Sequence, residues 1–248
     1  MRLEGKIAIV TGGGSGFGEG IATKFVKEGA RVLIADRDAA GGERVAHALG
    51  ANARSLCVDV SKSADVKAMM DAAQDHFGGL NVLINNAGIG HLPQPLEGLP
   101  EDQFDRIFAV NMKAIYLAAR EVVPRFKAQK KGVILNMAST AGVSPRPRLA
   151  WYNASKGWVI TATRAMAVEL APFGIRVVAL NPVAGETPLL KTFMGEDTPE
   201  MRAKFLSTIP IGRFSTPEDL ANAACFLCSD EASMVTGVAM EVDGGRCI

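Results

Sequence analysis

Tyr152 and Lys156 are four residues apart in the run WYNASKGW, and Ser139 lies thirteen positions upstream of the tyrosine. Residues four apart share one face of a helix, which would place the Lys156 ammonium beside the Tyr152 phenol. A free tyrosine titrates near pH ~10, and an adjacent cation favours the phenolate and lowers that pKa. The trio is therefore predicted to move a proton on and off a substrate oxygen, with the Ser139 hydroxyl holding that oxygen. The same spacing also occurs in ordinary amphipathic helices, so support must come from the rest of the chain.

A glycine-rich turn near the start of the chain gives that support. The apolar run KIAIVT ends in GGGSGFG, and helical apolar spacing follows from 19 to 27, which predicts a strand, a tight turn and a helix. Three glycines of this turn have separate roles. Gly12 permits the chain reversal, Gly16 lets the backbone approach a pyrophosphate, and Gly18 allows close helix packing. Backbone N–H groups at the helix start then bind the phosphates. The turn residues expected to contact a dinucleotide are Gly12, Ser15, Gly16, Phe17 and Gly18.

The second predicted strand, ARVLIAD, ends in Asp36, eighteen residues beyond Gly18. In NAD sites an acidic residue about 20 residues beyond the turn hydrogen-bonds the ribose 2′-hydroxyl. The same carboxylate would repel the 2′-phosphate of NADP. In addition, Ser15 occupies a position in the turn where a cationic side chain could otherwise help to bind that phosphate. Arg37 argues the other way, because its guanidinium could grip a 2′-phosphate if Asp36 moved aside. The sequence favours NAD over NADP.

Length and composition indicate one α/β domain over residues 1–248, since 48% of the residues are hydrophobic and no repeat or low-complexity stretch divides the chain. Short apolar strands alternate with helical stretches, which predicts a Rossmann fold: a doubly wound, seven-stranded parallel sheet with helices on both faces. The strands are expected at Lys6–Thr11, Arg31–Ala35, Ala53–Val58, Val82–Asn85, Gly132–Ala138, Ile175–Asn181 and Val238–Val242.

Charge, hydropathy and cysteine usage exclude several other classes. A net charge of +1 gives no basic footprint for nucleic acid. No apolar run reaches membrane-spanning length and no signal peptide is evident, so we expect a cytoplasmic protein without a membrane partner. Cys225 and Cys228 form C-x-x-C inside the apolar run AACFLCS, without a second ligand pair, and are expected to be buried thiols. The three histidines are scattered, and no metal site is expected.

The turn TGGGSGFG, the run NNAG at 85–88, Asn111, Ser139 and the Tyr152–Lys156 pair resemble, in this order, the short-chain dehydrogenase/reductase family over nearly the whole chain. The resemblance implies that Tyr152 is the catalytic acid/base and that Ser139 orients the substrate oxygen. Lys156 would hold the nicotinamide ribose and lower the tyrosine pKa. Asn111 would interrupt its helix locally and position a water that links Lys156 to solvent.

The same resemblance implies further cofactor contacts. Those on the adenosine side would come from Asp59, Val60, Asn86, Ala87 and Gly88, and those around the nicotinamide from Pro182, Val183 and Thr187. The family usually has glycine after the proline that corresponds to Pro182, where this chain has Val183. A contact of the nicotinamide with the backbone of this residue would survive the change to valine.

The predicted activity is the NAD-dependent interconversion of a secondary alcohol and a ketone by hydride transfer. The closest branches are the 3-oxoacyl-carrier-protein reductases and the sugar, polyol and secondary-alcohol dehydrogenases. An NADPH-dependent 3-oxoacyl-carrier-protein reductase is therefore the alternative. A non-catalytic nucleotide-sensing protein is a remote one, because such proteins tend to lose the tyrosine or the lysine.

The substrate and the assembly are less determined by the sequence. A substrate lid is expected at about 184–210. Arg146 and Arg148 either recognise an anionic substrate or form a solvated pair at a loop edge. Family members are commonly homotetramers, and in such an assembly Arg246, Cys247 or the terminal carboxylate of Ile248 could approach a neighbouring subunit's pocket.

Overall fold

The computed structural model describes all 248 residues and contains one seven-stranded parallel sheet in the order β3-β2-β1-β4-β5-β6-β7. The strands are β1 (Ile7–Thr11), β2 (Arg31–Asp36), β3 (Ala53–Cys57), β4 (Val82–Asn85), β5 (Gly132–Met137), β6 (Ile175–Pro182) and β7 (Ala239–Val242). All seven predicted strands are present, and no end differs by more than one residue. The strand order reverses between β1 and β4, where a doubly wound sheet opens a crevice beyond its carboxyl ends.

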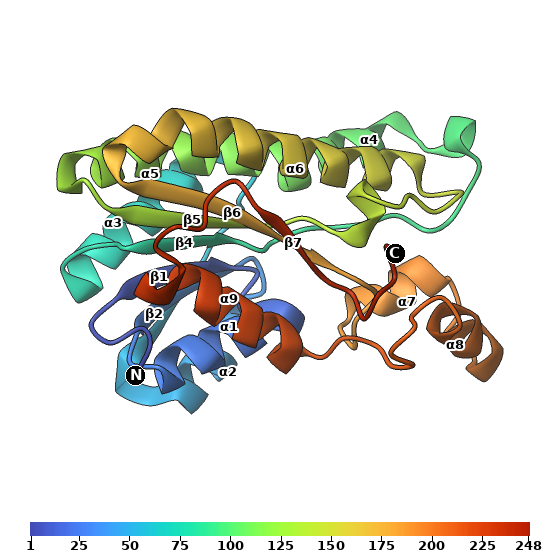
Figure 1. Ribbon diagram of the computed structural model, residues 1–248, viewed down its shortest axis with the longest axis horizontal. Helices are drawn as coiled ribbons and strands as arrows, with labels where there is room; N and C mark the ends of the chain where they lie inside the picture. The colour runs from blue at the N-terminus through green and yellow to red at the C-terminus, as the bar shows by residue number, and fades with distance from the viewer.

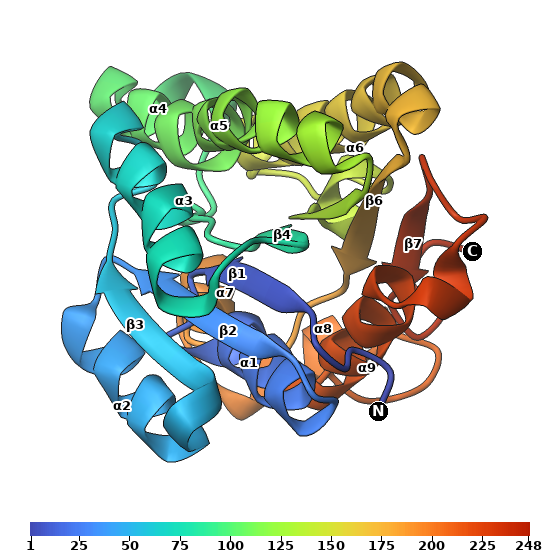
Figure 2. The ribbon, with the colours of Figure 1, turned by 90° about the vertical axis from the view of Figure 1, so that its left-hand side faces the viewer.

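Helices cover both faces of the sheet (Figures 1 and 2). One layer contains α1 (Gly16–Lys27), α2 (Ala39–Leu49) and α9 (Pro217–Cys228), and the other contains α3 (Ser63–Phe77), α4 (Glu101–Ile107), α5 (Ala114–Gln129) and α6 (Ala150–Leu170). Side chains of β1 alternate between the two cores: Ala8 and Val10 face α1 and α9, while Ile7 and Ile9 face α3 and α5. The central strands β1 and β4 are buried on both faces and are therefore almost continuous apolar runs, whereas the edge strands β3 and β7 are partly exposed.

Helix α9 packs against α1 and contains both cysteines of the C-x-x-C pattern. Cys225 and Cys228 are fully buried in the core between these helices and the sheet, so the prediction of buried thiols is confirmed. No helix of the chain combines the length and the apolar character needed to cross a membrane.

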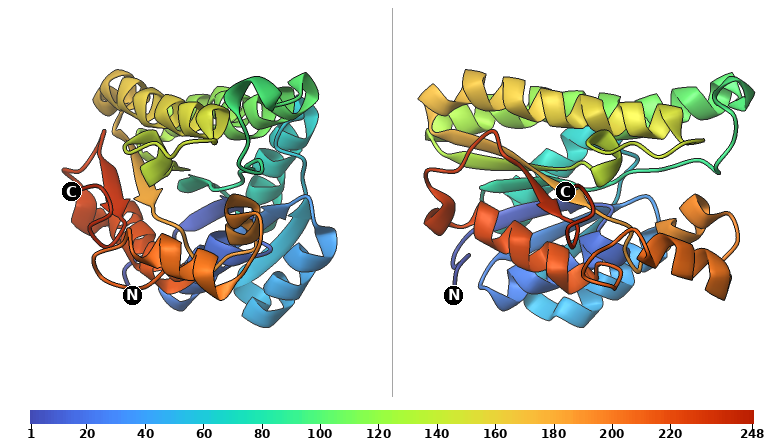
Figure 3. Two further views of the ribbon diagram at one scale, coloured as in Figure 1. Left: turned by 90° about the vertical axis from the view of Figure 1, so that its right-hand side faces the viewer. Right: turned by 45° about the vertical axis from the view of Figure 1, so that its right-hand side comes forward.

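Two short helices, α7 (Leu189–Met194) and α8 (Pro199–Leu206), lie outside the two layers, beside the carboxyl ends of the strands (Figure 3). They have a small apolar core of their own, formed by Val183, Leu190, Met194, Ile209 and Phe214. The segment is therefore anchored to the end of β6 and stands over the crevice without joining the main core. The C-terminal tail contacts the chain just after α8, where the Ile211 N–H donates to the Gly244 carbonyl oxygen at 3.1 Å.

Candidate active site

The glycine turn between β1 and α1 forms a narrow backbone cradle. Gly12 and Gly16 have φ values of 63° and 55°, in the left-handed region that L side chains rarely adopt. A Cβ added to Gly18 would collide with the Gly12 carbonyl oxygen, so the third glycine allows the helix to pack tightly against the turn. Helix α1 begins at Gly16 and directs its free N–H groups into the crevice. This cradle fits a pyrophosphate, as a dinucleotide cofactor requires.

Asp36 closes β2 and is held by two backbone donors. The Gly14 N–H donates to Asp36 Oδ2 at 2.8 Å, and the Asp38 N–H donates to Oδ1 at 2.9 Å. A carboxylate fixed in this way keeps lone pairs free to accept from a diol. Arg37 follows it and is exposed.

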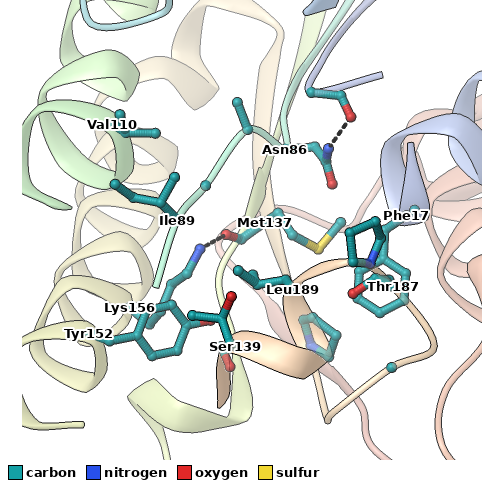
Figure 4. Close-up of a pocket in the computed structure, with 18 of the residues that line it drawn as sticks. Phe17, Asn86, Ile89, Val110, Met137, Ser139, Tyr152, Lys156, Thr187 and Leu189 are labelled. Atoms are coloured by element: carbon teal, nitrogen blue, oxygen red, sulfur yellow. Dashed lines mark hydrogen bonds between the residues drawn. The ribbon is translucent and has the colours of Figure 1, made fainter. Parts of the chain in front are cut away.

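The end of β4 is tied to the glycine turn. Asn86 Nδ2 donates to the carbonyl oxygens of Thr11 and Gly12 at 2.8 and 3.1 Å, and one hydrogen bond of this side chain is drawn in Figure 4. The Ala87 N–H donates to Thr11 Oγ1 at 3.0 Å. The NNAG run therefore fixes the relative position of the two strands that border the crevice. Beyond the edge strand β3, Asp59 Oδ1 accepts from the Ser61 hydroxyl at 2.6 Å.

A single cavity of about 450 Å³ runs along the carboxyl end of the sheet. It brings together most of the residues selected from the sequence: Gly12, Ser15, Gly16, Phe17, Asp36, Arg37, Asp59, Val60, Asn86, Ala87, Gly88, Ser139, Tyr152, Lys156, Pro182, Val183 and Thr187. Only Gly18 and Asn111 of the selected set do not line it. Gly18 supports the turn from beneath, and Asn111 lies buried behind the cavity wall.

Tyr152, Lys156 and Ser139 converge at one end of this cavity. The tyrosine and lysine come from the first turns of α6, where their spacing places both on the buried face, with only 6% and 5% of each exposed. Ser139 follows β5 and its Oγ accepts from the Ala141 N–H. Lys156 Nζ lies 5.8 Å from the centre of the tyrosine ring and donates to the Met137 carbonyl oxygen at 2.8 Å (Figure 4).

Burial controls the ionisation of both groups. It raises the pKa of Tyr152 to about 12, although a hydrogen bond with Ser139 and the charge of Arg146 act in the opposite direction. Burial likewise lowers the pKa of Lys156 to about 8. Loss of solvent therefore outweighs the two opposing effects on the tyrosine pKa, and the lowering of that pKa by Lys156 stays a prediction. At neutral pH the phenol is protonated and the lysine is mostly cationic.

Asn111 lies in a π-helical turn, Phe108–Lys113, between α4 and α5. The predicted local interruption of the helix is thus present, and such turns are frequent at functional sites. Its side chain accepts from the Ile89 N–H and donates to the Ile89 carbonyl oxygen, both at 2.9 Å, and also donates to Ser155 Oγ at 3.1 Å. Asn111 therefore fixes the loop after β4 against α6, next to Lys156.

Phe193 of α7 is a cavity residue that the sequence did not single out. Its ring lies 4.7 Å from that of Tyr152, measured between centroids. A Cβ on Gly90 would collide with the Phe193 ring, so the glycine leaves room for it. The signal in the sequence was only its position inside the expected lid. Further apolar walls come from Ile89, Val110, Met137 and Leu189 (Figure 4).

A Rossmann sheet with a phosphate cradle at its switch point and a buried Tyr–Lys–Ser cluster in the same cavity defines a dinucleotide-dependent oxidoreductase. The sequence profile of the family described as enoyl-(acyl carrier protein) reductase matches residues 12–246. The chain belongs to the short-chain dehydrogenase/reductase family, and it is an oxidoreductase that uses a nicotinamide cofactor.

The chain is 49% identical to 4-formylbenzenesulfonate dehydrogenase of Comamonas testosteroni, over 100% of both chains. It is 40% identical to 2-(S)-hydroxypropyl-CoM dehydrogenase 3 of Xanthobacter autotrophicus, over 98% of this chain and 97% of that one. Among solved structures, 3-ketoacyl-(acyl-carrier-protein) reductase from Brucella melitensis, complexed with NADH, superposes with a TM-score of 0.95. It has 56% identity and covers 99% of this chain and 100% of that one.

Proposed function

We propose that this protein interconverts a secondary alcohol and a ketone with NAD(H), using Tyr152 as the acid/base. The observation that carries the proposal is that Tyr152, Ser139 and Lys156 line the same cavity as the glycine turn and Asp36. When bound, the nicotinamide cofactor supplies or accepts the hydride. The relatives named as dehydrogenases of hydroxyl and formyl compounds support this class of reaction.

The proton chemistry follows from the site. With its pKa raised to about 12, Tyr152 holds its proton at neutral pH and can donate it to a carbonyl oxygen that gains negative charge. Ser139 Oγ lies beside it to orient that oxygen. The Lys156 ammonium stabilises the phenolate left behind, since the two groups share one buried face. In alcohol oxidation the same groups act in reverse.

Asp36 supports NAD as the cofactor. Its carboxylate is fixed at the end of β2 by the Gly14 and Asp38 N–H groups, so it is not free to move aside for a 2′-phosphate. A second anion there would meet strong repulsion at short range. The related ketoacyl reductase structure holds NADH, which agrees with this preference. Arg37 is exposed and makes no ion pair with Asp36.

Absorbance at 340 nm tests the proposal, with NADH or NADPH and a panel of ketones, or with NAD or NADP and the matching secondary alcohols, polyols and hydroxy acids. We expect turnover with NAD(H), lost in Tyr152→Phe. Tyr116→Phe is the matched control, because Tyr116 is the only other tyrosine and is exposed on α5. Loss of activity in both variants, or in neither, would contradict the role given to Tyr152.

The second candidate is an NADPH-dependent 3-oxoacyl-carrier-protein reductase. The similarity to the Brucella melitensis protein of that name favours its substrate class. Turnover confined to NADPH and β-ketoacyl thioesters would establish this function and overturn the argument from Asp36.

We also propose that the segment at about 184–210 acts as the substrate lid and that the protein is a homotetramer. Phe193 in this segment already contacts the catalytic tyrosine, which supports a lid.

The proposed subunit interface is supported by apolar side chains that are exposed on α5 and α6 and just after α6. These side chains are Tyr116, Trp158, Val168 and Phe173. Light scattering after size-exclusion chromatography measures the assembly. Val168→Glu is expected to shift it to smaller species.

A further inference from the structure

Arg146 is the only arginine at the end of the cavity that holds Tyr152. It lies on the loop between β5 and α6, and its guanidinium stacks on the Phe205 ring of α8, 4.4 Å from the ring centre. The guanidinium forms no ion pair. Its five donors are therefore available to the cavity. An arginine that is half-buried without a counter-charge is costly, and such groups commonly mark binding sites.

A second unpaired arginine approaches the same loop from the C-terminal tail. Arg246 Nη1 donates to Ser144 Oγ at 3.1 Å, and its Nε is buried without a hydrogen-bond partner. Arg246 forms no ion pair with Asp243, whose carboxylate accepts from the Gly245 and Cys247 N–H groups. Burial, and next the charge of Arg246, lower the pKa of Arg146. The two cations repel each other, and a bound anion would relieve that repulsion.

No carboxylate lines the substrate end of the cavity. The only carboxylates lining the cavity are Asp36 and Asp59, and both lie at the strand ends near the glycine turn. The titratable groups at the other end are Tyr152, Lys156 and Arg146. This half of the cavity is therefore electropositive and is complementary to an anionic substrate.

We propose that Arg146, supported by the charge of Arg246, binds a carboxylate or sulfonate group on the substrate, so that the preferred substrates are anionic hydroxy and oxo compounds. This inference rests on the proposed function for the position of the reacting oxygen at Tyr152. A planar guanidinium matches both oxyanions with two parallel hydrogen bonds, which a lysine cannot supply. Phe205 would hold the guanidinium plane in place, and Arg246 contacts the loop that carries Arg146 through Ser144 of the same subunit.

Arg148 has no such role. It is exposed and does not line the cavity. Its one hydrogen bond involves the backbone, where the Arg148 carbonyl oxygen accepts from the Gln94 N–H. The two arginines of the RPR run are therefore separated, one facing the cavity and one facing solvent. Arg148→Gln gives a matched control for Arg146→Gln, since both variants remove one arginine charge from the same loop.

The test is a calorimetric titration of benzoate, benzenesulfonate and the neutral benzamide into the full-length protein with NADH present. We expect at least one anion to bind about tenfold more tightly than benzamide, which corresponds to about 1.4 kcal/mol. Arg146→Gln should remove this preference, and Arg148→Gln should keep it within about twofold. The comparison of benzoate with benzenesulfonate identifies which oxyanion the site prefers. Arg146→Lys should restore only part of the preference.

Two results would overturn the inference: no preference for either anion in the unmodified protein, or equal preference in Arg146→Gln. A loss confined to Arg148→Gln would also overturn it, because it would assign the anion to the exposed arginine of the loop and not to the cavity. These outcomes are independent of the acid/base proposal, which is measured by turnover of Tyr152→Phe. Anion binding that depends on Arg146, in a protein whose turnover survives Tyr152→Phe, would retain the anion site and refute the acid/base role.

Discussion

Replacing Lys156 with methionine tests how strongly burial governs the site. Lys156 is 5% exposed and makes one hydrogen bond, to the Met137 carbonyl oxygen. Its pKa falls from 10.5 to about 8 on folding. Because the folded-state value is the lower one, the unfolded chain binds more protons between pH 8 and 10.5, so stability rises with pH across that range. Below pH 8 the buried ammonium costs about 3 kcal/mol of unfolding free energy, at about 1.4 kcal/mol per pKa unit.

Lys156→Met removes this titration. At pH 9.5 the cost of the lysine has fallen to about 1 kcal/mol, so the stability of the variant relative to the unmodified protein should decrease by about 2 kcal/mol between pH 7 and 9.5. For a chain of this size that is a change of about 4–8 °C in the difference between the two Tm values. Tyr152, with its pKa raised to about 12, affects both proteins equally and cancels.

Thermal unfolding without cofactor, followed by circular dichroism at pH 7, 8, 9 and 9.5, measures the difference. Lys204→Met on α8 is the control, because Lys204 is exposed and its removal should give a difference that does not vary with pH. A Tm difference for Lys156→Met that stays constant from pH 7 to 9.5 would refute the reasoning, since it would mean that burial does not depress the lysine pKa.

Three further perturbations address the cradle, the cofactor and the lid. Gly18→Ala should lower the unfolding free energy by about 2–4 kcal/mol in urea denaturation, because a methyl group meets the Gly12 carbonyl oxygen; stability equal to that of the unmodified protein would contradict the close packing. Asp36→Ala should raise the ratio of kcat/KM with NADP to that with NAD by at least about tenfold, and an unchanged ratio would remove Asp36 from cofactor selection. Phe193→Ala should raise KM for the ketone by about 2–10-fold with little change in Tm, as expected for loss of one aromatic contact with Tyr152; an unchanged KM would argue against a lid contact.

The fold could be predicted from the sequence because each buried strand is a short apolar run bounded by turn residues. β4 (Val82–Asn85) agrees at both ends, and each of the other strands differs by one residue at one end. The glycine turn and Asp36 could be placed because their spacing depends on local chain geometry. The helical spacing of Tyr152 and Lys156 also determined that they share a face.

The rest depends on tertiary burial and on contacts between distant segments, which no local pattern contains. The pKa of Tyr152 is one case: the spacing showed a neighbouring cation, whereas the depth of burial decides the direction. Arg146 and Arg148 are another, since only Arg146 lines the cavity, whereas Arg148, with a left-handed φ of 65°, is exposed. The contact of Phe193 with Tyr152 joins residues 41 positions apart in sequence.

The most direct test of the central claim measures cofactor binding and turnover in one preparation of Tyr152→Phe. NADH fluorescence gives the Kd, and absorbance at 340 nm gives the rate with a ketone that the unmodified protein reduces. The account predicts a Kd within about twofold of the unmodified protein and a rate lower by about 10²–10⁴-fold, the range of general acid–base catalysis. A variant that binds NADH and still reduces the ketone at more than about one tenth of the original rate would contradict it.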